Sequence, residues 1–194
     1  MVETKIKNNN LPGQKILPAT ATPNQKKKRR GSASEYKKSL EEKQALKRLY
    51  GLSEKQFKRY VKESLAKIRR VENVSDELIK ALEKRLDNAI FRLGFAKTRL
   101  MARQLVNHSY FLVNGKPVNF PSYKLEKGDI ISIKDGKKKK LVFEDLMKSI
   151  NKIETPSWLK LDKDKLLAQT IGEPTLAEVN PPVEISLIFE FYSR

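Results

Sequence analysis

The chain has 194 residues, and its 41 Lys and Arg against 23 Asp and Glu give a formal net charge of +18 at pH 7. This length suits one domain or two small ones, and such an excess of positive charge is typical of proteins that bind a polyanion, most often nucleic acid. The absence of cysteine excludes disulfides, thiolate zinc sites and thiol catalysis, and a single histidine disfavours a histidine-rich metal site. Because the sequence contains neither a run of about 18 apolar residues nor a secretory leader, we expect a soluble, intracellular protein.

The positive charge is distributed unevenly along the chain. Residues 1–31 carry a net charge of +7, residues 32–78 carry +4, residues 79–140 carry +10 and residues 141–194 carry −3. A charge that served only solubility would be spread more evenly, so this clustering favours a binding surface.

Residues 1–31 have no apolar periodicity and end in a run of cations. Five consecutive like charges repel one another in isolation and become ordered against phosphates. We therefore expect an extended basic arm that contacts nucleic acid, with a non-specific arm or a localisation signal as the open alternative. The run consists of Lys26, Lys27, Lys28, Arg29 and Arg30.

The first two predicted helices each begin at a capping-box spacing. Ser32-Ala33-Ser34-Glu35 begins a helix that runs to about Tyr50 and ends at Gly51. Ser53-Glu54-Lys55-Gln56 begins the second helix, which carries apolar residues at helical spacing and cations on its other sides.

Two further helices are predicted before the pattern changes. The third begins at Ser75 and ends at Gly94, with a buried stripe that includes Leu82 and Leu86. The fourth covers about residues 97–108, with Thr98 as its N-cap.

Residues 110–133 instead have the pattern of a small antiparallel sheet. Asn114-Gly115 between two β-prone runs is a strong hairpin pattern, and residues 130–133 form another strand. For residues 82–140 the sequence therefore predicts two helices packed on a small antiparallel sheet.

The C-terminal part is expected to be mainly helical. It has a helix near residues 141–150, a linker at residues 156–159 and a last element from Asn180 to Arg194. Asn180 as N-cap before Pro181 favours a helix there, whereas alternating apolar residues favour a strand, so both stay open. The predicted class is α+β: an extended basic arm (1–31), a helical domain (32–81 plus 141–194) and an inserted compact domain (82–140).

Arginine stripes on the third and fourth helices predict a phosphate-binding face. Guanidinium groups suit bidentate phosphate contacts, and few acidic residues lie between these cations. An ordinary solvated face is the alternative. The stripes consist of Arg85, Asn88 and Arg92 on one helix, and of Arg99, Arg103 and Asn107 on the other.

The sequence contains no arrangement of residues that predicts catalysis. Phosphate-binding glycine loops, nucleophile elbows and zinc-protease motifs are all absent from it. Asp87 could be a general base, but Lys84 and Arg85 beside it favour an ion-paired structural role. His108 is favoured as a helix-end cap or an RNA contact. We expect no enzyme activity, no cofactor and no small-molecule substrate.

Several segments carry a family resemblance. Arg85-Leu86-Asp87-Asn88, Leu93-Gly94-Phe95-Ala96, Ala102-Arg103-Gln104-Leu105-Val106 and Leu112-Val113-Asn114-Gly115-Lys116 resemble the RNA-binding domain named after small-subunit ribosomal protein four. That domain also occurs in pseudouridine synthases and tyrosyl-tRNA synthetases. The flanks, including Glu42-Lys43-Gln44 and Phe191-Tyr192-Ser193-Arg194, resemble the ribosomal family itself from about Gln25 to the last residue.

The resemblance implies a structural protein of the small ribosomal subunit. It implies binding to a multi-helix junction in the 5′ domain of the rRNA, nucleation of subunit-body assembly and a contribution to translational accuracy. The implied partners are small-subunit rRNA and small-subunit ribosomal protein five, close to the region where mRNA enters. By motif position, the RNA contacts of the compact domain correspond to Arg99, Arg103, Gln104 and His108. We infer further RNA contacts in the matching segments at Tyr36, Lys43, Arg48, Tyr50, Gln56, Arg59, Tyr60 and Lys116.

The chain departs from the family pattern in two places. The first 24 residues match poorly and hold no cysteine, which indicates a zinc-free form with a divergent arm, and Ser109 and Tyr110 replace the usual residues after the histidine. A free-standing or regulatory RNA-binding protein is the main alternative function, whereas an RNA-modifying enzyme lacks room for a catalytic domain. A bacterial cytoplasmic ribosome and an organellar ribosome both stay open.

Overall fold

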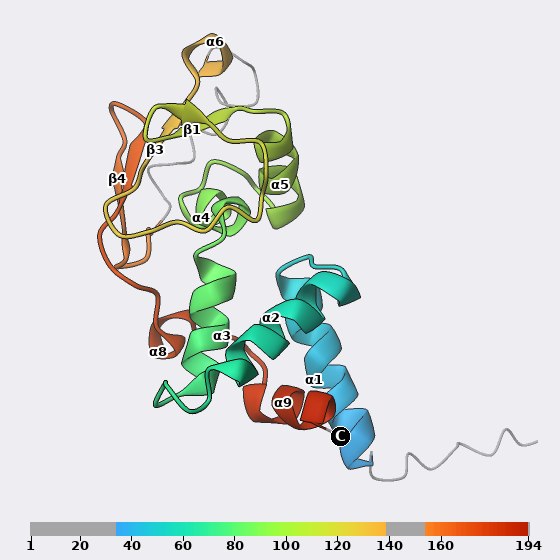
Figure 1. The fold of residues 1–194 in the computed structure, drawn as a ribbon. Helices are drawn as coiled ribbons and strands as arrows, with labels where there is room; N and C mark the ends of the chain where they lie inside the picture. Colours follow the sequence, from blue (N-terminus) through green and yellow to red (C-terminus); the bar gives the residue numbers. More distant parts are fainter. Residues whose placement is uncertain (1–33, 139–153, 194) are drawn as a thin grey trace, which may run out of the picture. The chain divides into compact units, whose positions relative to one another are not determined.

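A computed structural model describes residues 34–138 and 154–193 (Figure 1). The described residues combine helices with one five-stranded antiparallel sheet, which confirms the predicted α+β class. The elements in chain order are α1 (Glu35–Leu49), α2 (Glu54–Ala66), α3 (Val74–Glu83), α4 (Leu86–Arg92), α5 (Arg99–Asn107), β1 (Phe111–Val113), β2 (Lys116–Pro117), β3 (Ile130–Ile133), α6 (Asp135–Lys138), β4 (Leu159–Asp162), β5 (Leu167–Thr170), α8 (Leu176–Val179) and α9 (Ile185–Ser193).

The starts of α1 and α2 follow from side-chain caps. Ser34 caps α1, because its hydroxyl accepts the backbone N–H of Lys37, so the expected cap at Ser32 is wrong. At α2 the capping box is confirmed: the Ser53 hydroxyl accepts from the Gln56 N–H at 3.3 Å, and the Gln56 side chain accepts from the Ser53 N–H at 3.2 Å.

The predicted third helix is two helices, so the expectation of one continuous helix is wrong. Arg85 has an extended backbone between α3 and α4 and bridges to Lys124. The N–H of Leu86 donates to the carbonyl of Tyr123 at 2.9 Å, and the carbonyl of Lys84 accepts from the N–H of Leu125 at 2.8 Å. These bonds occupy backbone groups that a continuous helix would pair internally.

The sheet has the strand order β2-β1-β3-β5-β4, and every neighbouring pair is antiparallel. The predicted hairpin between β1 and β2 is confirmed, and Asn114 and Gly115 both have positive φ, as its tight turn requires. Residues 159–170 form β4 and β5, so our expectation of a mainly helical segment is wrong there. These strands extend the sheet of the compact domain.

The buried apolar side chains of the described residues form two clusters. One lies between α4, α5 and the sheet and includes Phe95, Phe111 and Trp158. The other, here called the α1–α3 cluster, joins α1, α2, α3 and α9 and includes Leu46, Phe57 and Leu82. Figure 1 shows the same grouping of elements.

The last element is a helix, α9, which decides between the two open alternatives. Ile185 and Ile188 lie one turn apart and are buried against the α1–α3 cluster. Asn180 does not cap this helix. It ends α8 instead, in a left-handed conformation with φ of 35°. The basic run at residues 26–30 and the helix expected near residues 141–150 lie outside the described residues.

Candidate nucleic-acid interface

Two buried carboxylates organise the junction between α3, α4 and α5. Glu83 ends α3 with no exposed surface. Its carboxylate accepts hydrogen bonds from the Tyr50 hydroxyl at 2.7 Å, from Asn88 Nδ2 at 2.6 Å and from Arg92 Nε and Nη2 at 3.0 and 2.8 Å. Burial, followed by the Glu83 charge, raises the pKa of Tyr50 well above its usual value, so Tyr50 remains a neutral donor.

Asp87 is the second buried carboxylate, and it binds two arginines. Arg85 donates to it from Nε at 3.0 Å and from Nη2 at 2.8 Å, and Arg103 donates from Nε at 3.0 Å and from Nη2 at 2.9 Å. Arg85 also donates to the hydroxyl of Tyr60 at 2.7 Å. Burial alone would lower the pKa of Arg85, but the bonds to Asp87 outweigh it and raise that pKa.

Arg103 connects the compact domain to the end of α1. Its guanidinium donates to the backbone carbonyls of Gly51 and Tyr50, in addition to Asp87. Gly51 has φ of +60°, a left-handed conformation that glycine adopts without strain and that ends α1.

These contacts correct the predicted arginine face. Arg85 is only 3% exposed and does not lie on a surface, and Arg92 and Arg103 are half-buried in ion pairs with Glu83 and Asp87. Few acidic residues lie between the arginines in the sequence, but two buried carboxylates, those of Glu83 and Asp87, pair with three of the arginines. The structural, ion-paired role expected for Asp87 is confirmed.

Arg99 differs from the other three arginines. Its Nε donates to Asn88 Oδ1 at 2.8 Å, and its guanidinium carbon lies 4.4 Å from the ring centroid of Phe91 and 5.0 Å from that of Tyr50. Burial lowers the pKa of Arg99. Within residues 34–138 and 154–193 no carboxylate forms an ion pair with it, so this half-buried cation is held in place by a neutral amide and two rings.

A shallow surface hollow opens beside Arg99. Its cations are Arg48 near the end of α1, Lys97, and Arg99 at the start of α5. Thr98 caps α5 by accepting the N–H of Met101 at 3.1 Å, so the positive end of this nine-residue helix adjoins the hollow. No acidic side chain lines this hollow in the part of the chain that the structure describes. Its chemistry suits a phosphate group.

Comparison with known proteins decides the family. The S4 domain family matches residues 84–131, and the family described as Ribosomal protein S4/S9 N-terminal domain matches residues 4–83. Small ribosomal subunit protein uS4 of Sulfurihydrogenibium sp. (strain YO3AOP1) is 46% identical over 165 residues, which cover 84% of this chain and 79% of that protein. The chain belongs to the uS4 family.

Other members of the uS4 family are similar over comparable lengths. The protein of Persephonella marina is 44% identical over 166 residues (85% of this chain, 80% of the relative), and that of Chromobacterium violaceum is 38% identical over 174 residues (90% and 83%). The N-terminal match begins at residue 4, earlier than the start near Gln25 that we expected. The two family matches meet between residues 83 and 84, where α3 ends.

The remaining candidate residues separate into buried and exposed groups. Lys43 is 5% exposed and donates to Glu54 at 2.9 Å, and Tyr50 and Tyr60 are buried, so these three support the fold. Tyr36 is exposed and lies against Phe191. The others are exposed: Arg48, Gln56, Arg59, Gln104, Asn107, His108 and Lys116. His108 also ends α5 as its C-cap residue, as the structural alternative predicts.

Sequence reasoning missed the roles of Glu83, Asn88 and Lys97. Glu83 stands between Leu82 and Leu86 of the apolar stripe, a position that could have indicated its burial. Helical spacing places Asn88 on a phosphate-binding stripe, but its side chain donates to Glu83 and accepts from Arg99. Lys97 precedes the predicted cap of α5, and only its position in the hollow identifies it as a candidate phosphate contact.

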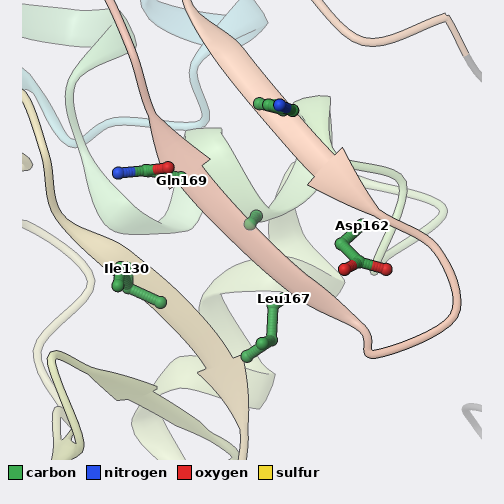
Figure 2. A pocket seen from close by; sticks show the side chains of 6 residues that line it. Ile130, Asp162, Leu167 and Gln169 are labelled. Atoms are coloured by element: carbon green, nitrogen blue, oxygen red, sulfur yellow. The ribbon is translucent and has the colours of Figure 1, made fainter.

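A second hollow lies on the outer face of β3, β5 and β4 (Figure 2). Ile130, Leu167 and Gln169 lie on this face, with Lys160 and Asp162 on the edge strand. The described residues contain no group of three or more side chains that could hold a metal ion, and none of their helices is long and apolar enough to span a membrane.

Proposed function

We propose that this protein is a structural, rRNA-binding protein of the small ribosomal subunit. Membership of the uS4 family supports this function. The single observation that carries it is Arg99, an arginine held in a basic hollow with no carboxylate partner among the described residues. A backbone phosphate of RNA supplies the missing counter-charge.

The hollow binds phosphate through one fixed cation and two exposed cations. Asn88 and two aromatic rings fix Arg99 before the RNA arrives, so little side-chain entropy is lost on binding. Arg48 and Lys97 add exposed positive charge, and the start of α5 adds the positive end of the helix dipole. Gln104, Asn107 and His108 lie farther along α5 and are exposed to contact the same RNA.

The finer role follows from the family resemblance. We propose binding to the multi-helix junction in the 5′ domain of the rRNA, nucleation of subunit-body assembly, a contribution to translational accuracy, and a non-catalytic function. We also propose that ribosomal protein five is a neighbour, close to the region where mRNA enters. Ile130, which is exposed on the outer face of β3, supports a protein contact on that face of the sheet.

Binding of the purified full chain to a transcribed 5′ domain of a bacterial small-subunit rRNA tests the proposal. We expect tighter binding than to an unrelated transcript of equal length, with a steep dependence on salt. The double variant Arg48→Gln with Lys97→Gln should weaken binding, whereas Lys160→Gln with Lys165→Gln removes equal charge outside the hollow and should not. Equal affinity for both transcripts contradicts the proposal.

Cofractionation distinguishes the regulatory alternative. A structural subunit component stays with small subunits in high-salt sucrose gradients at one copy per particle, whereas a transient or regulatory factor is released. Release at high salt would favour the alternative.

A further inference from the structure

A small polar cavity lies between α2, α3 and residues 122–124. Its volume is about 70 Å³, whereas one water molecule requires roughly 10–15 Å³. Three buried polar side chains line it: Tyr60 is 8% exposed, Ser64 2% and Arg85 3%. Lys124, which is exposed, completes this part of the lining. The cavity therefore has room for a ligand larger than one water molecule.

The buried side chains present hydrogen-bond donors to the cavity. The Tyr60 hydroxyl accepts from Arg85 Nη1 at 2.7 Å, but within residues 34–138 and 154–193 no group accepts the proton of that hydroxyl. The Ser64 hydroxyl has no hydrogen-bond partner among the same residues. Arg85 binds Asp87 through Nε and Nη2 and binds Tyr60 through Nη1, so part of its donor capacity remains. Buried donors without acceptors are costly, so this lining favours a ligand rich in acceptor oxygens.

The charges around the cavity leave one cation over. Glu77 forms an ion pair with Lys67, and Glu63 lies 3.6 Å from Arg59. Lys124 forms no ion pair in the part of the chain that the structure describes. Since the acidic side chains of the lining have their own partners, the remaining charge is positive and suits an anion.

We propose that this cavity binds one small oxyanion, such as inorganic phosphate. Its ligands are the hydroxyls of Tyr60 and Ser64, the guanidinium of Arg85 and the ammonium of Lys124. The anion would join α2, which carries Tyr60 and Ser64, to the segment that bridges Arg85 at the break between α3 and α4. The site is separate from the hollow at Arg99 and does not rest on the proposed function.

The small volume of the cavity favours a free anion over a phosphate of an RNA strand. Each phosphate within a strand is linked to two riboses, and a cavity of about 70 Å³ does not admit them. The donors that would bind the anion also belong to side chains with almost no exposed surface, Ser64 and Arg85.

The test compares the thermal unfolding midpoints of full-length variants in phosphate and in chloride at equal ionic strength. In chloride, Ser64→Ala should keep the wild-type midpoint, because no described residue bonds to the hydroxyl that it removes. At a phosphate concentration about tenfold above the dissociation constant, the bound anion should raise the wild-type midpoint by roughly 3–5 °C. Loss of one hydrogen bond to a charged group weakens binding about tenfold, so Ser64→Ala should lose more than half of that rise.

A second variant tests the charge of the site. Lys124→Gln should also lose most of the phosphate-dependent rise, whereas Lys127→Gln should keep it. Lys127 is a matched control, because it is exposed in the same segment and does not line the cavity. The Ser64→Ala effect should persist in the background Arg48→Gln with Lys97→Gln, which removes two cations from the hollow at Arg99.

Three results would overturn the proposal. Equal phosphate-dependent rises in the wild type, Ser64→Ala and Lys124→Gln would mean that phosphate acts on the overall charge and not in the cavity. A lower midpoint of Ser64→Ala in chloride would mean that the hydroxyl serves the fold. Weaker binding of Ser64→Ala to the 5′ domain transcript, without loss of the phosphate-dependent rise, would assign these donors to RNA. Selection of the transcript by the wild type tests the proposed function separately.

Discussion

The arginines around α5 and the lysines of α2 carry the same charge in opposite environments. Arg85, Arg92 and Arg103 are held by two buried carboxylates, whereas Lys55, Lys58 and Lys62 face outward from a helix without an ion pair among the described residues. Arg99 lies between these extremes, because its half-buried guanidinium contacts the amide of Asn88 and two aromatic rings. The comparison indicates that arginine near this junction stabilises the fold, and we propose that RNA binding depends on the cations left without carboxylates.

The largest expected effect is on stability, from Asp87→Ala. This change leaves the buried guanidinium of Arg85 without its charge partner and removes one anchor of Arg103. We expect a loss of about 3–5 kcal/mol in the free energy of unfolding, measured by urea denaturation. Asp87→Asn keeps the shape of the side chain and should lower the free energy of unfolding by less. A loss below about 1 kcal/mol for Asp87→Ala would show that the paired arginines do not stabilise the junction.

A smaller loss is expected from Glu83→Gln. The amide keeps the size of the side chain but removes the charge that Arg92 and Tyr50 share, so we expect a loss of about 1.5–3 kcal/mol. The Glu83 charge contributes to the raised pKa of Tyr50, so that pKa should fall in the variant. Tyrosinate absorbance, with Tyr50→Phe identifying the Tyr50 signal, measures the shift. An unchanged Tyr50 titration would contradict the assigned contact.

The smallest effect concerns the partly exposed ion pairs of Glu54. Partial burial raises its pKa, but hydrogen bonds from Lys43, Lys47 and Tyr192 dominate and lower that pKa from 4.5 to about 2. Because the folded pKa is depressed, this stabilisation is present above pH ~4.5 and is lost as the pH falls towards 2. Its size should stay below about 1 kcal/mol, because the side chain is 45% exposed and solvent screens the pairs.

The matched variant for this prediction is Glu54→Gln. Between pH ~4.5 and 2 its unfolding free energy should fall less steeply than that of the wild type, as followed by urea denaturation at each pH. If the unfolding free energies of the variant and the wild type changed in parallel with pH, the Glu54 pairs would add no stability.

The sequence predicted the features that depend on neighbouring residues. The capping box at Ser53, the N-cap at Thr98 and the hairpin at Asn114 all form as expected, because their determinants lie within a few residues. The break between α3 and α4 was not predictable in this way. It depends on backbone bonds to Tyr123 and Leu125, nearly forty residues away in sequence.

The candidate site was predicted only in part for a similar reason. Helical spacing places arginines on a stripe, but spacing cannot tell whether a carboxylate from the preceding helix reaches them. Glu83 comes from α3 and Gly51 from the end of α1, and both contact arginines of the compact domain. Strand β5 was missed because its pairing with β3 is also long-range, and β4 joins the sheet only through its hairpin with β5.

The salt dependence of RNA affinity in two single variants tests the central claim most directly. In Arg99→Gln the log–log slope for the 5′ domain transcript should flatten by about 0.7–0.9, with a smaller loss of unfolding free energy than in Arg103→Gln. In Arg103→Gln the slope should stay that of the wild type while the unfolding free energy falls, because that guanidinium binds Asp87 and two backbone carbonyls. An unchanged slope for Arg99→Gln, or an equal flattening in both variants, would contradict the division between arginines that hold the fold and cations that bind RNA.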